Sequence, residues 1–219
     1  MPKATFNKLK PDKRKQFTDA FLREFALHSY DEASLTSVVS ELGIAKGSVY
    51  QYFNDKLDLF TFLVGEGAAV KANYIGHLKR TDFPDFWLYF RALYERGVKF
   101  DLENPLQSHF LHKLVDNINS PSIQHLYKNM LDQTVTVFEK MVESEIAIGK
   151  FRRDIPAKTQ GFFLYKASLA INDQLLALGE IDPKKSIEKG LPVFHKKEEV
   201  LLRTVDQYIE ILKAALDKR

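Results

Sequence analysis

Apolar positions repeat at three- and four-residue intervals along almost the whole chain, which is the period of an amphipathic α-helix. Phe17, Phe21 and Phe25 lie four residues apart and predict a helix over about residues 12–28. The same period predicts further helices at residues 35–42, 46–52, 56 into the 70s, 86–100, 123–148, 159–178 and 198–216. No segment shows the period of two that marks a half-buried strand. The pattern therefore predicts an all-α protein of about nine helices.

Residues that start or stop helices separate these segments. Ser34 is a good N-cap for the second predicted helix, and Gly43 is placed to end it in the left-handed conformation. Several of the widely spaced prolines beyond residue 80 stand where a helix would begin. Residues 179–197 are the one long stretch in which we expect irregular structure.

Residues 34–56, SLTSVVSELGIAKGSVYQYFNDK, predict a helix-turn-helix, because two short helices are joined by a tight turn that contains glycine. Val49 and Phe53 are four residues apart and are expected to face the core. The opposite arc and its flanks can enter a major groove without a clash, since they carry Gly47, Ser48, Gln51, Lys46, Tyr50 and Tyr52. An ordinary helical hairpin is the alternative interpretation.

This segment resembles the DNA-binding domain of the TetR family of bacterial transcriptional regulators, from Phe17 to roughly Phe60. The run GIAKGSVYQYFNDKL at residues 43–57 follows the family's pattern: Gly before Val or Ile, a small polar residue, Tyr-x-x-Phe, and an Asn/Asp-Lys pair. One departure is Ala45, where the family usually has a Ser or Thr N-cap before the recognition helix. Alanine there would leave a backbone amide without a hydrogen bond, which would cost about 1 kcal/mol of stability.

The resemblance implies an N-terminal three-helix DNA-binding domain at 12–56, a basic arm at 1–11 before it, and a larger helical ligand-binding and dimerisation domain at 57–219. It also implies how DNA would be contacted. In chain order the implied contacts are Ser34 and Thr36 from the second helix, Lys46, Gly47, Ser48 and Gln51 near base edges, Tyr50 and Tyr52 against the backbone, and Lys56 on a phosphate.

Charge is uneven along the chain, whose net charge is +3. Residues 1–15 hold six bases and one acid, so all the excess positive charge lies there. Such an arm could contact phosphate or the minor groove, or it could be a solvated terminus. The chain has no cysteine, which excludes disulfides, thiolate zinc sites and cysteine nucleophiles. It also has no apolar run of about 18 residues, so we expect a cytoplasmic protein without a membrane segment.

Sequence motifs of enzymes are missing, and we expect no catalytic residue, cofactor or metal. The chain contains no GxSxG, HExxH or paired Glu-x-x-His. Lys46-Gly47-Ser48 and Gly65-Glu66-Gly67 lack the strand that a phosphate or dinucleotide loop requires. His109, His112 and Asp116 share a helix face and could hold a divalent metal, but a pocket wall or an exposed face explains them as well.

Aromatic residues concentrate after residue 80, with eight between Phe83 and Phe110. An aromatic stripe is often plain core. The family resemblance instead implies a cavity for a small effector, which we expect to be aromatic, acyl or otherwise lipophilic. The candidate lining residues are Phe86, Trp87, Phe90, Tyr94, His109, His112, Tyr127, Phe138 and Phe163.

The last two long helices are the expected dimer interface, because the family typically packs them into a four-helix bundle. Residues 198–216 carry a broad apolar stripe, and Asn172-Asp173-Gln174 needs polar partners from a ligand or from a second copy. The sequence thus predicts a homodimeric repressor that a small effector releases from a near-palindromic operator. The alternatives are an activator of the same family, a helical-bundle enzyme, or a protein-interaction module.

Overall fold

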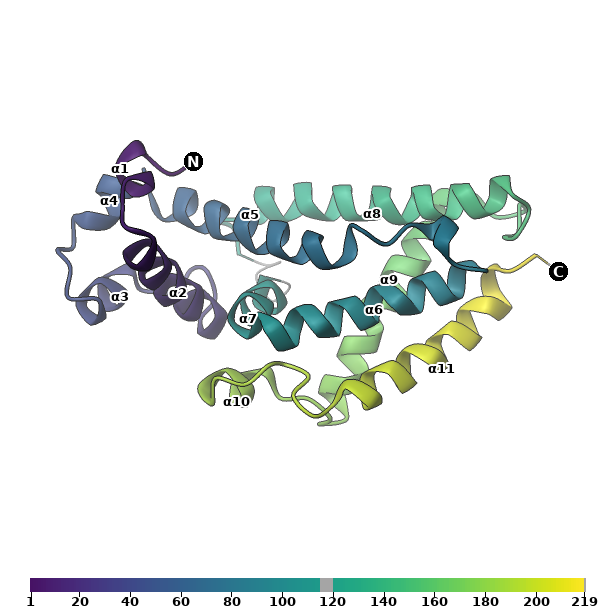
Figure 1. The fold of residues 1–219 in the computed structure, drawn as a ribbon. Coiled ribbons are helices and arrows are strands. Elements are labelled where there is room, and N and C mark those ends of the chain that lie inside the picture. The colour runs from purple at the N-terminus through teal and green to yellow at the C-terminus, as the bar shows by residue number, and fades with distance from the viewer. Residues whose placement is uncertain (115–119, 219) are drawn as a thin grey trace. The chain divides into compact units, whose positions relative to one another are not determined.

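The computed structural model describes residues 1–114 and 120–218, and within them the fold is helical (Figure 1). The described residues also contain an isolated antiparallel β-bridge, between Phe151 and Asp217. The helices are α1 Ala4–Asn7, α2 Pro11–Leu27, α3 Leu35–Glu41, α4 Ser48–Tyr52, α5 Lys56–Ile75, the 3-10 helix η1 Arg80–Asp82, α6 Phe86–Glu103, α7 Pro105–Lys113, α8 Gln124–Ala147, α9 Ala157–Ala177, α10 Pro183–Glu188 and α11 Glu198–Leu216. The all-α prediction is confirmed.

Every helix that the periodicity predicts is present, with ends that differ by a few residues. Three helices were not predicted: α1 in the basic arm, α7, and α10 in the stretch expected to be irregular. All three have nine residues or fewer. So short a segment carries too few apolar positions to establish a period, and its helical structure depends on tertiary packing.

Both ends of α3 follow from their sequence. The Ser34 hydroxyl oxygen accepts a hydrogen bond from the Ser37 N–H at 3.2 Å, so the predicted N-cap is confirmed. Gly43 has a φ of +64° and ends the helix as predicted. The Ile44 N–H donates to the Val39 carbonyl at 3.0 Å and the Gly43 N–H to the Ser40 carbonyl at 3.1 Å. This is the Schellman pair of bonds, which satisfies the last carbonyls of the helix.

The chain divides into two compact units. The first comprises Met1–Asn73, Phe100–Tyr127 and Pro183–Val193, and the second comprises Tyr74–Lys99, Lys128–Asp182 and Phe194–Arg219. Because the division falls within α5, α6 and α8, the units do not follow chain order. The predicted boundary after residue 56 stays a prediction.

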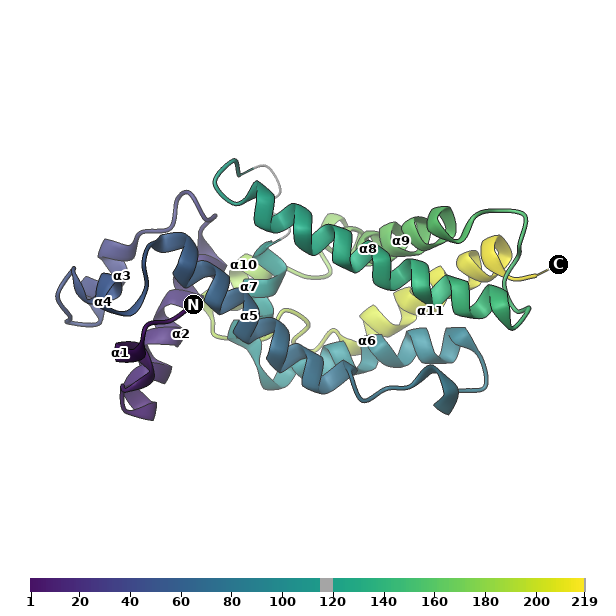
Figure 2. The same ribbon diagram turned by 90° about the horizontal axis from the view of Figure 1, so that it is seen from above.

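In the first unit α2 packs along α7, which buries aromatic rings from both helices. The Phe110 ring centroid lies 5.5 Å from that of Phe60 and 6.4 Å from that of Phe25. The chain around α10 joins the same unit, and Figure 2 shows α10 beside α7. Two hydrogen bonds hold the segment that follows α10. The Asp101 carboxylate accepts from the Val193 N–H at 3.1 Å, and His109 Nε2 bonds the Leu191 carbonyl at 2.8 Å.

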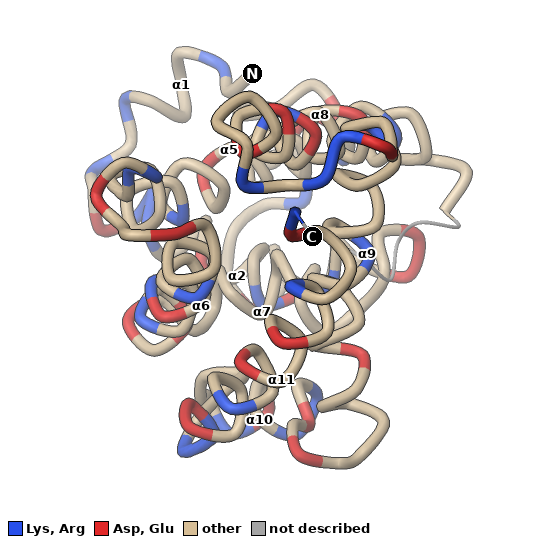
Figure 3. The backbone as a smooth tube through the Cα atoms, turned by 90° about the vertical axis from the view of Figure 1, so that its right-hand side faces the viewer, with Lys and Arg blue, Asp and Glu red and all other residues tan. Residues whose placement is uncertain are grey.

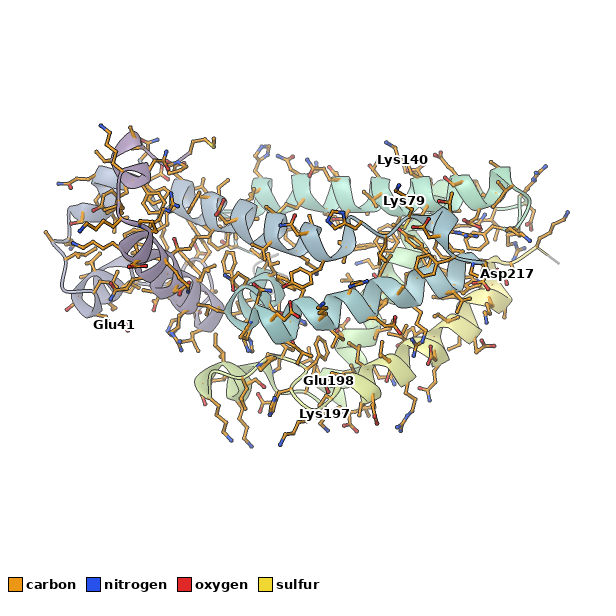
Figure 4. The ribbon with its side chains drawn as sticks, viewed as in Figure 1. Glu41, Lys79, Lys140, Lys197, Glu198 and Asp217 are labelled. Carbon is orange, nitrogen blue, oxygen red and sulfur yellow. The ribbon has the colours of Figure 1, made fainter. Side chains whose placement is uncertain are left out.

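In the second unit α9 packs against α11. The buried residues of α11 are Leu201, Thr204, Val205, Ile209, Leu212 and Leu216. The Arg80 guanidinium forms two bonds, at 2.7 and 3.0 Å, with the carboxylate of Glu145, which is 1% exposed. Asp217, labelled in Figure 4, accepts from the Trp87 indole N–H at 2.9 Å. These polar contacts connect segments that are far apart in the sequence of this unit.

Charged residues of both signs are mixed along the helices. Figure 3 shows Lys and Arg interspersed with Asp and Glu along α6 and α11. None of the described helices has the length and apolar character to cross a membrane.

Candidate nucleic-acid interface

Helices α3 and α4 and the turn between them carry most of the residues predicted to contact DNA. Val49 is 1% exposed and Phe53 is 0% exposed, so the predicted inward face of α4 is confirmed. Tyr50 is 51% exposed on the other side, and Gln51 is exposed beside it. An exposed, polar and aromatic face on a short helix is the arrangement that a major groove can accept.

The turn before α4 corrects one expectation. The N-cap of α4 is Gly47, so Ala45 lies outside the helix rather than at its cap. The Ala45 carbonyl accepts from the Ser48 N–H at 2.8 Å, and no side chain caps α4. The cost expected for alanine at the N-cap therefore does not arise at residue 45. Lys46 and Gly47 are both exposed in this turn.

On α3 the two predicted contact residues differ in exposure. Thr36 is exposed, whereas Ser34 is half-buried and its N–H donates to the Glu24 carboxylate at 2.6 Å. Glu41, labelled in Figure 4, is exposed at the C-terminal end of the same helix. A phosphate contact from Ser34 remains a prediction.

Lys56 has partners inside the protein that its position in the motif does not reveal. Its ammonium donates to the Ala33 carbonyl at 2.6 Å and lies 4.9 Å from the Tyr30 ring centroid. Burial lowers the pKa of Lys56, and the carboxylates of Asp31 and Glu24 oppose that shift. Lys56 thus joins the start of α5 to the loop before α3. Its predicted phosphate contact is untested, and would use a remaining N–H of the ammonium.

Tyr52 is half-buried rather than fully exposed to solvent. Its ring centroid lies 5.8 Å from that of Phe6 and 5.4 Å from that of Phe17. These contacts hold the C-terminal end of α4 against α1 and α2. A role in bracing the DNA backbone would fall to the part of the ring that remains exposed, and it too remains a prediction.

The N-terminal segment is the feature that sequence reasoning missed. Lys3 N–H donates to the Tyr52 carbonyl at 2.7 Å, its ammonium donates to the Tyr50 carbonyl at 2.8 Å, and Phe6 is 1% exposed. The alternative of a solvated terminus is therefore wrong for Lys3 and Phe6. The sequence signal was a single phenylalanine within a basic run, which is too little to define a period.

The predicted effector residues are distributed over both units. Phe86, Trp87 and Phe90 are at most 5% exposed, and the centroids of Phe86 and Trp87 lie 5.1 and 5.4 Å from that of Phe151. These rings form a packed cluster in the second unit. The Tyr94 hydroxyl donates to the Ser168 carbonyl at 3.3 Å, and burial raises the pKa of Tyr94. Their contact with an effector remains a prediction.

Other predicted effector residues have varied surroundings. Phe138 is half-buried with its ring centroid 5.7 Å from that of Tyr165, whereas Phe163 is 45% exposed. In the first unit His109 is 4% exposed, and His112 and Tyr127 are half-buried. The structure does not bring these nine residues together around one described cavity.

A metal at His109 and His112 was the alternative for this helix face. Asp116, the third predicted ligand, lies outside the described residues. Among the residues that are described, no group of three or more His, Cys, Asp or Glu is placed to hold a metal ion. His109 Nε2 instead bonds the Leu191 carbonyl.

A surface pocket of about 400 Å³ lies in the first unit. Its lining residues come from α1, α2, α5 and α7: Phe6, Asn7, Pro11, Arg14, Lys15, Thr18, Asp19, Phe62, Glu66 and Gln107. None of the nine predicted effector residues is among them.

In the polar block on α9, Gln174 has a partner within its own chain, where a ligand or a second copy was expected. The Gln174 side-chain oxygen accepts from the Tyr208 hydroxyl at 3.1 Å within the same chain, and Asp173 is exposed. The apolar stripe of α11 is largely buried within its own unit. The exposed apolar side chains of these two helices are Phe162, Phe163, Leu176 and Ile211.

Comparison with known proteins places residues 17–61 in the family model TetR_N, described as bacterial regulatory proteins of the tetR family. The matched residues include α3, the turn and α4. No curated protein sequence matches the chain.

Solved structures are similar over nearly the whole chain. A TetR family transcriptional regulator from Chloroflexus aurantiacus J-10-FL is 27% identical with a TM-score of 0.78, covering 100% of both chains. A second TetR regulator from that organism is 12% identical with a TM-score of 0.64, covering 95% of this chain and 98% of its own. SmeT in complex with triclosan is 15% identical with a TM-score of 0.64, covering 94% and 92%.

Proposed function

We propose, from the premise that this chain belongs to the TetR family of bacterial transcriptional regulators, that it is a homodimeric repressor which a small effector releases from DNA. The observation that carries the proposal is the exposed face of α4, with Tyr50 and Gln51 outward while Val49 and Phe53 anchor the helix. This face belongs to a domain that matches the family model. The protein would act on DNA in the bacterial cytosol.

Recognition would use two copies of α4 related by a two-fold axis. Each copy would read a half-site in the major groove, with half-sites about one helical turn apart or slightly more. The operator would then be a near-palindrome, because a two-fold protein presents the same surface twice. Since both half-sites must be contacted together, a small change in separation of the two helices would weaken binding.

An effector can shift this equilibrium only if it binds the two arrangements with different affinity. The complex of the similar protein SmeT with triclosan supports a small-molecule effector for this chain. The aromatic composition of the second unit supports a lipophilic or aromatic one. A thermal-shift screen in which only highly polar compounds stabilise the protein would contradict this part of the proposal.

Dimerisation would use the outer faces of α9 and α11. Phe162 is 46% exposed and Leu176 is 42% exposed, and their spacing places them on one stripe of α9. Ile211 is 63% exposed on α11. Apolar side chains exposed along two long helices favour an interface with a second copy over a solvated surface.

The experiment that tests this function is selection of bound duplexes from a random pool at moderate salt, with Tyr50→Ala as the control. We expect the wild type alone to enrich a near-palindrome. The recovered duplex placed upstream of a reporter gene then distinguishes repression from activation. If neither protein enriches any sequence, with or without lipophilic compounds, the function as a DNA-reading regulator is wrong.

A further inference from the structure

Helix α4 is too short to hold its own conformation. It has five residues, and the N–H of its C-cap residue Phe53 donates to the Val49 carbonyl at 2.8 Å. The last carbonyls of any helix need partners from outside it. Isolated helices of this length are unstable in water, so contacts elsewhere must fix α4.

The N-terminal segment supplies these partners. The Tyr50 carbonyl accepts from the Lys3 ammonium at 2.8 Å, and the Tyr52 carbonyl accepts from the Lys3 N–H at 2.7 Å. Between them the Gln51 carbonyl accepts from the Thr5 hydroxyl. Three consecutive carbonyls at the end of α4 are therefore bonded by two residues that lie more than 45 positions earlier in the chain.

Phe6 anchors the segment that makes these bonds. Its side chain is 1% exposed, and its ring centroid lies within 5.8 Å of four aromatic rings. The centroid separations are 5.6 Å to Phe17, 5.8 Å to Tyr52, 5.1 Å to Phe53 and 5.4 Å to Phe62. Figure 1 shows α1 lying against α4. Since these rings come from α2, from α4 and its C-cap, and from α5, Phe6 fixes the segment to the three helices α2, α4 and α5.

The charge on Lys3 has a specific location. Its ammonium lies at the C-terminal end of α4, where the helix dipole favours a cation. Lys8 and Lys10, in the same basic run, are exposed to solvent. Lys3 is therefore bonded to α4, whereas Lys8 and Lys10 are available to solvent.

We propose that Lys3, Thr5 and Phe6 form an N-terminal clamp that positions the DNA-reading helix. The clamp acts through α4 and does not itself read bases. A helix that is already held in place loses less conformational entropy when it enters a groove, so the clamp raises operator affinity without changing sequence preference. The effect on affinity rests on the proposed DNA-binding function, whereas the ordering of α4 does not.

Hydrogen exchange of the full-length protein without DNA tests the clamp directly. Thr5→Val keeps the shape of the side chain and removes its donor, and Thr5→Ser keeps the donor. We expect Thr5→Val to speed exchange of the Tyr52 and Phe53 amides about fivefold, the effect of losing one hydrogen bond. Thr5→Ser should exchange like the wild type. Equal rates in all three proteins would overturn the proposal.

A second pair of variants separates the hydrogen bond from the charge. Lys3→Met and Lys8→Met each remove one positive charge from the same segment, but only the first removes a bond to α4. We expect faster exchange at Tyr52 and Phe53 in Lys3→Met alone. Equal acceleration in both variants would show a general charge effect and would overturn the clamp.

Affinity for the selected duplex supplies the functional measurement. We expect Thr5→Val to weaken binding about fivefold with the same preferred sequence and the same salt dependence, and Thr5→Ser to restore it. Faster exchange with unchanged affinity would overturn the positioning role. If the wild type recovers no duplex, the proposed function fails, and the exchange experiment still decides whether the clamp orders α4.

Discussion

Tyr50 on α4 and the C-cap residue Phe53 have opposite surroundings although they are three positions apart. Phe53 is 0% exposed and contacts the rings of Phe6, Phe17 and Phe62, whereas Tyr50 is 51% exposed. Burial therefore predicts which substitution affects folding and which affects DNA binding.

We expect Phe53→Ala to lower the free energy of unfolding by ~3–5 kcal/mol, the usual cost of truncating a buried aromatic side chain. Tyr50→Ala should change it by less than about 0.5 kcal/mol, as exposed substitutions do, while abolishing binding to the selected duplex. Urea unfolding and a DNA-binding titration measure the two effects. If Tyr50→Ala unfolds the domain, the assignment of its face to DNA is wrong.

A second prediction at this scale concerns pH. Burial lowers the pKa of His109, opposed by its bond to the Leu191 carbonyl and by Asp101. Because the folded pKa is lower than the unfolded value, the unfolded chain binds the proton first as the pH falls. The stabilising contribution is complete above about pH 6.5 and is lost between that pH and the lower folded pKa.

Thermal unfolding between pH 7.5 and 5.5 measures this contribution. We expect the melting temperature of the wild type to fall, and that of His109→Gln to fall less, since glutamine keeps an N–H donor without titrating. His77→Gln removes an exposed histidine and should behave like the wild type. The same pH dependence in all three proteins would contradict the role assigned to His109.

At the scale of elements, α8 and α9 approach each other closely at Gly161, a residue that has no side chain. A Cβ built on Gly161 would lie 2.7 Å from both the N and the Cα of Glu139 on α8. These are backbone atoms, so the contact can be relieved only by moving a helix. The glycine therefore sets how closely α8 and α9 approach.

We expect Gly161→Ala to destabilise the protein by about 1–3 kcal/mol through overpacking. The matched control is Gly65→Ala on α5, where a Cβ would meet nothing within 4 Å and alanine should stabilise the helix by up to about 1 kcal/mol. Calorimetric unfolding compares the two variants. A Gly161→Ala protein as stable as the wild type would show that the crossing is not close.

The basic arm gives a second prediction for an element. Lys8 and Lys10 are exposed and remain available for phosphate. Changing both to Gln should reduce the slope of log affinity against log salt by up to about 0.9 for each phosphate that the arm no longer binds, with no change in preferred sequence. Lys128→Gln with Lys140→Gln removes the same charge from exposed positions of α8. If both double variants have equal slopes of log affinity against log salt, the arm does not contact DNA phosphates.

At the scale of the whole molecule, the proposed interface predicts a dimer in sedimentation at micromolar concentration. Phe162→Glu together with Ile211→Glu places charges on the proposed interface faces of α9 and α11, so it should give a folded monomer that binds the operator poorly. Leu88→Glu changes an exposed residue of α6 that is outside the proposed interface, and it should remain dimeric. A wild-type monomer would contradict the proposed assembly.

The sequence by itself determined the helical class, the main helices and the helix-turn-helix. These features depend on interactions between residues a few positions apart. Examples are the Ser34 cap, the left-handed Gly43, and the four-residue spacing that buries Val49 and Phe53. Local geometry repeats wherever such residues recur, so a pattern is enough to predict it.

Only the tertiary structure decided which distant residues share a contact. The bonds of Lys3 and Thr5 to the end of α4 and the inward partner of Lys56 join segments more than 20 positions apart. A lysine in a motif looks the same whether its ammonium faces solvent or a carbonyl, because that choice depends on packing against remote helices. For the same reason α1 and α10, which are too short for a period of their own, appeared only in the folded chain.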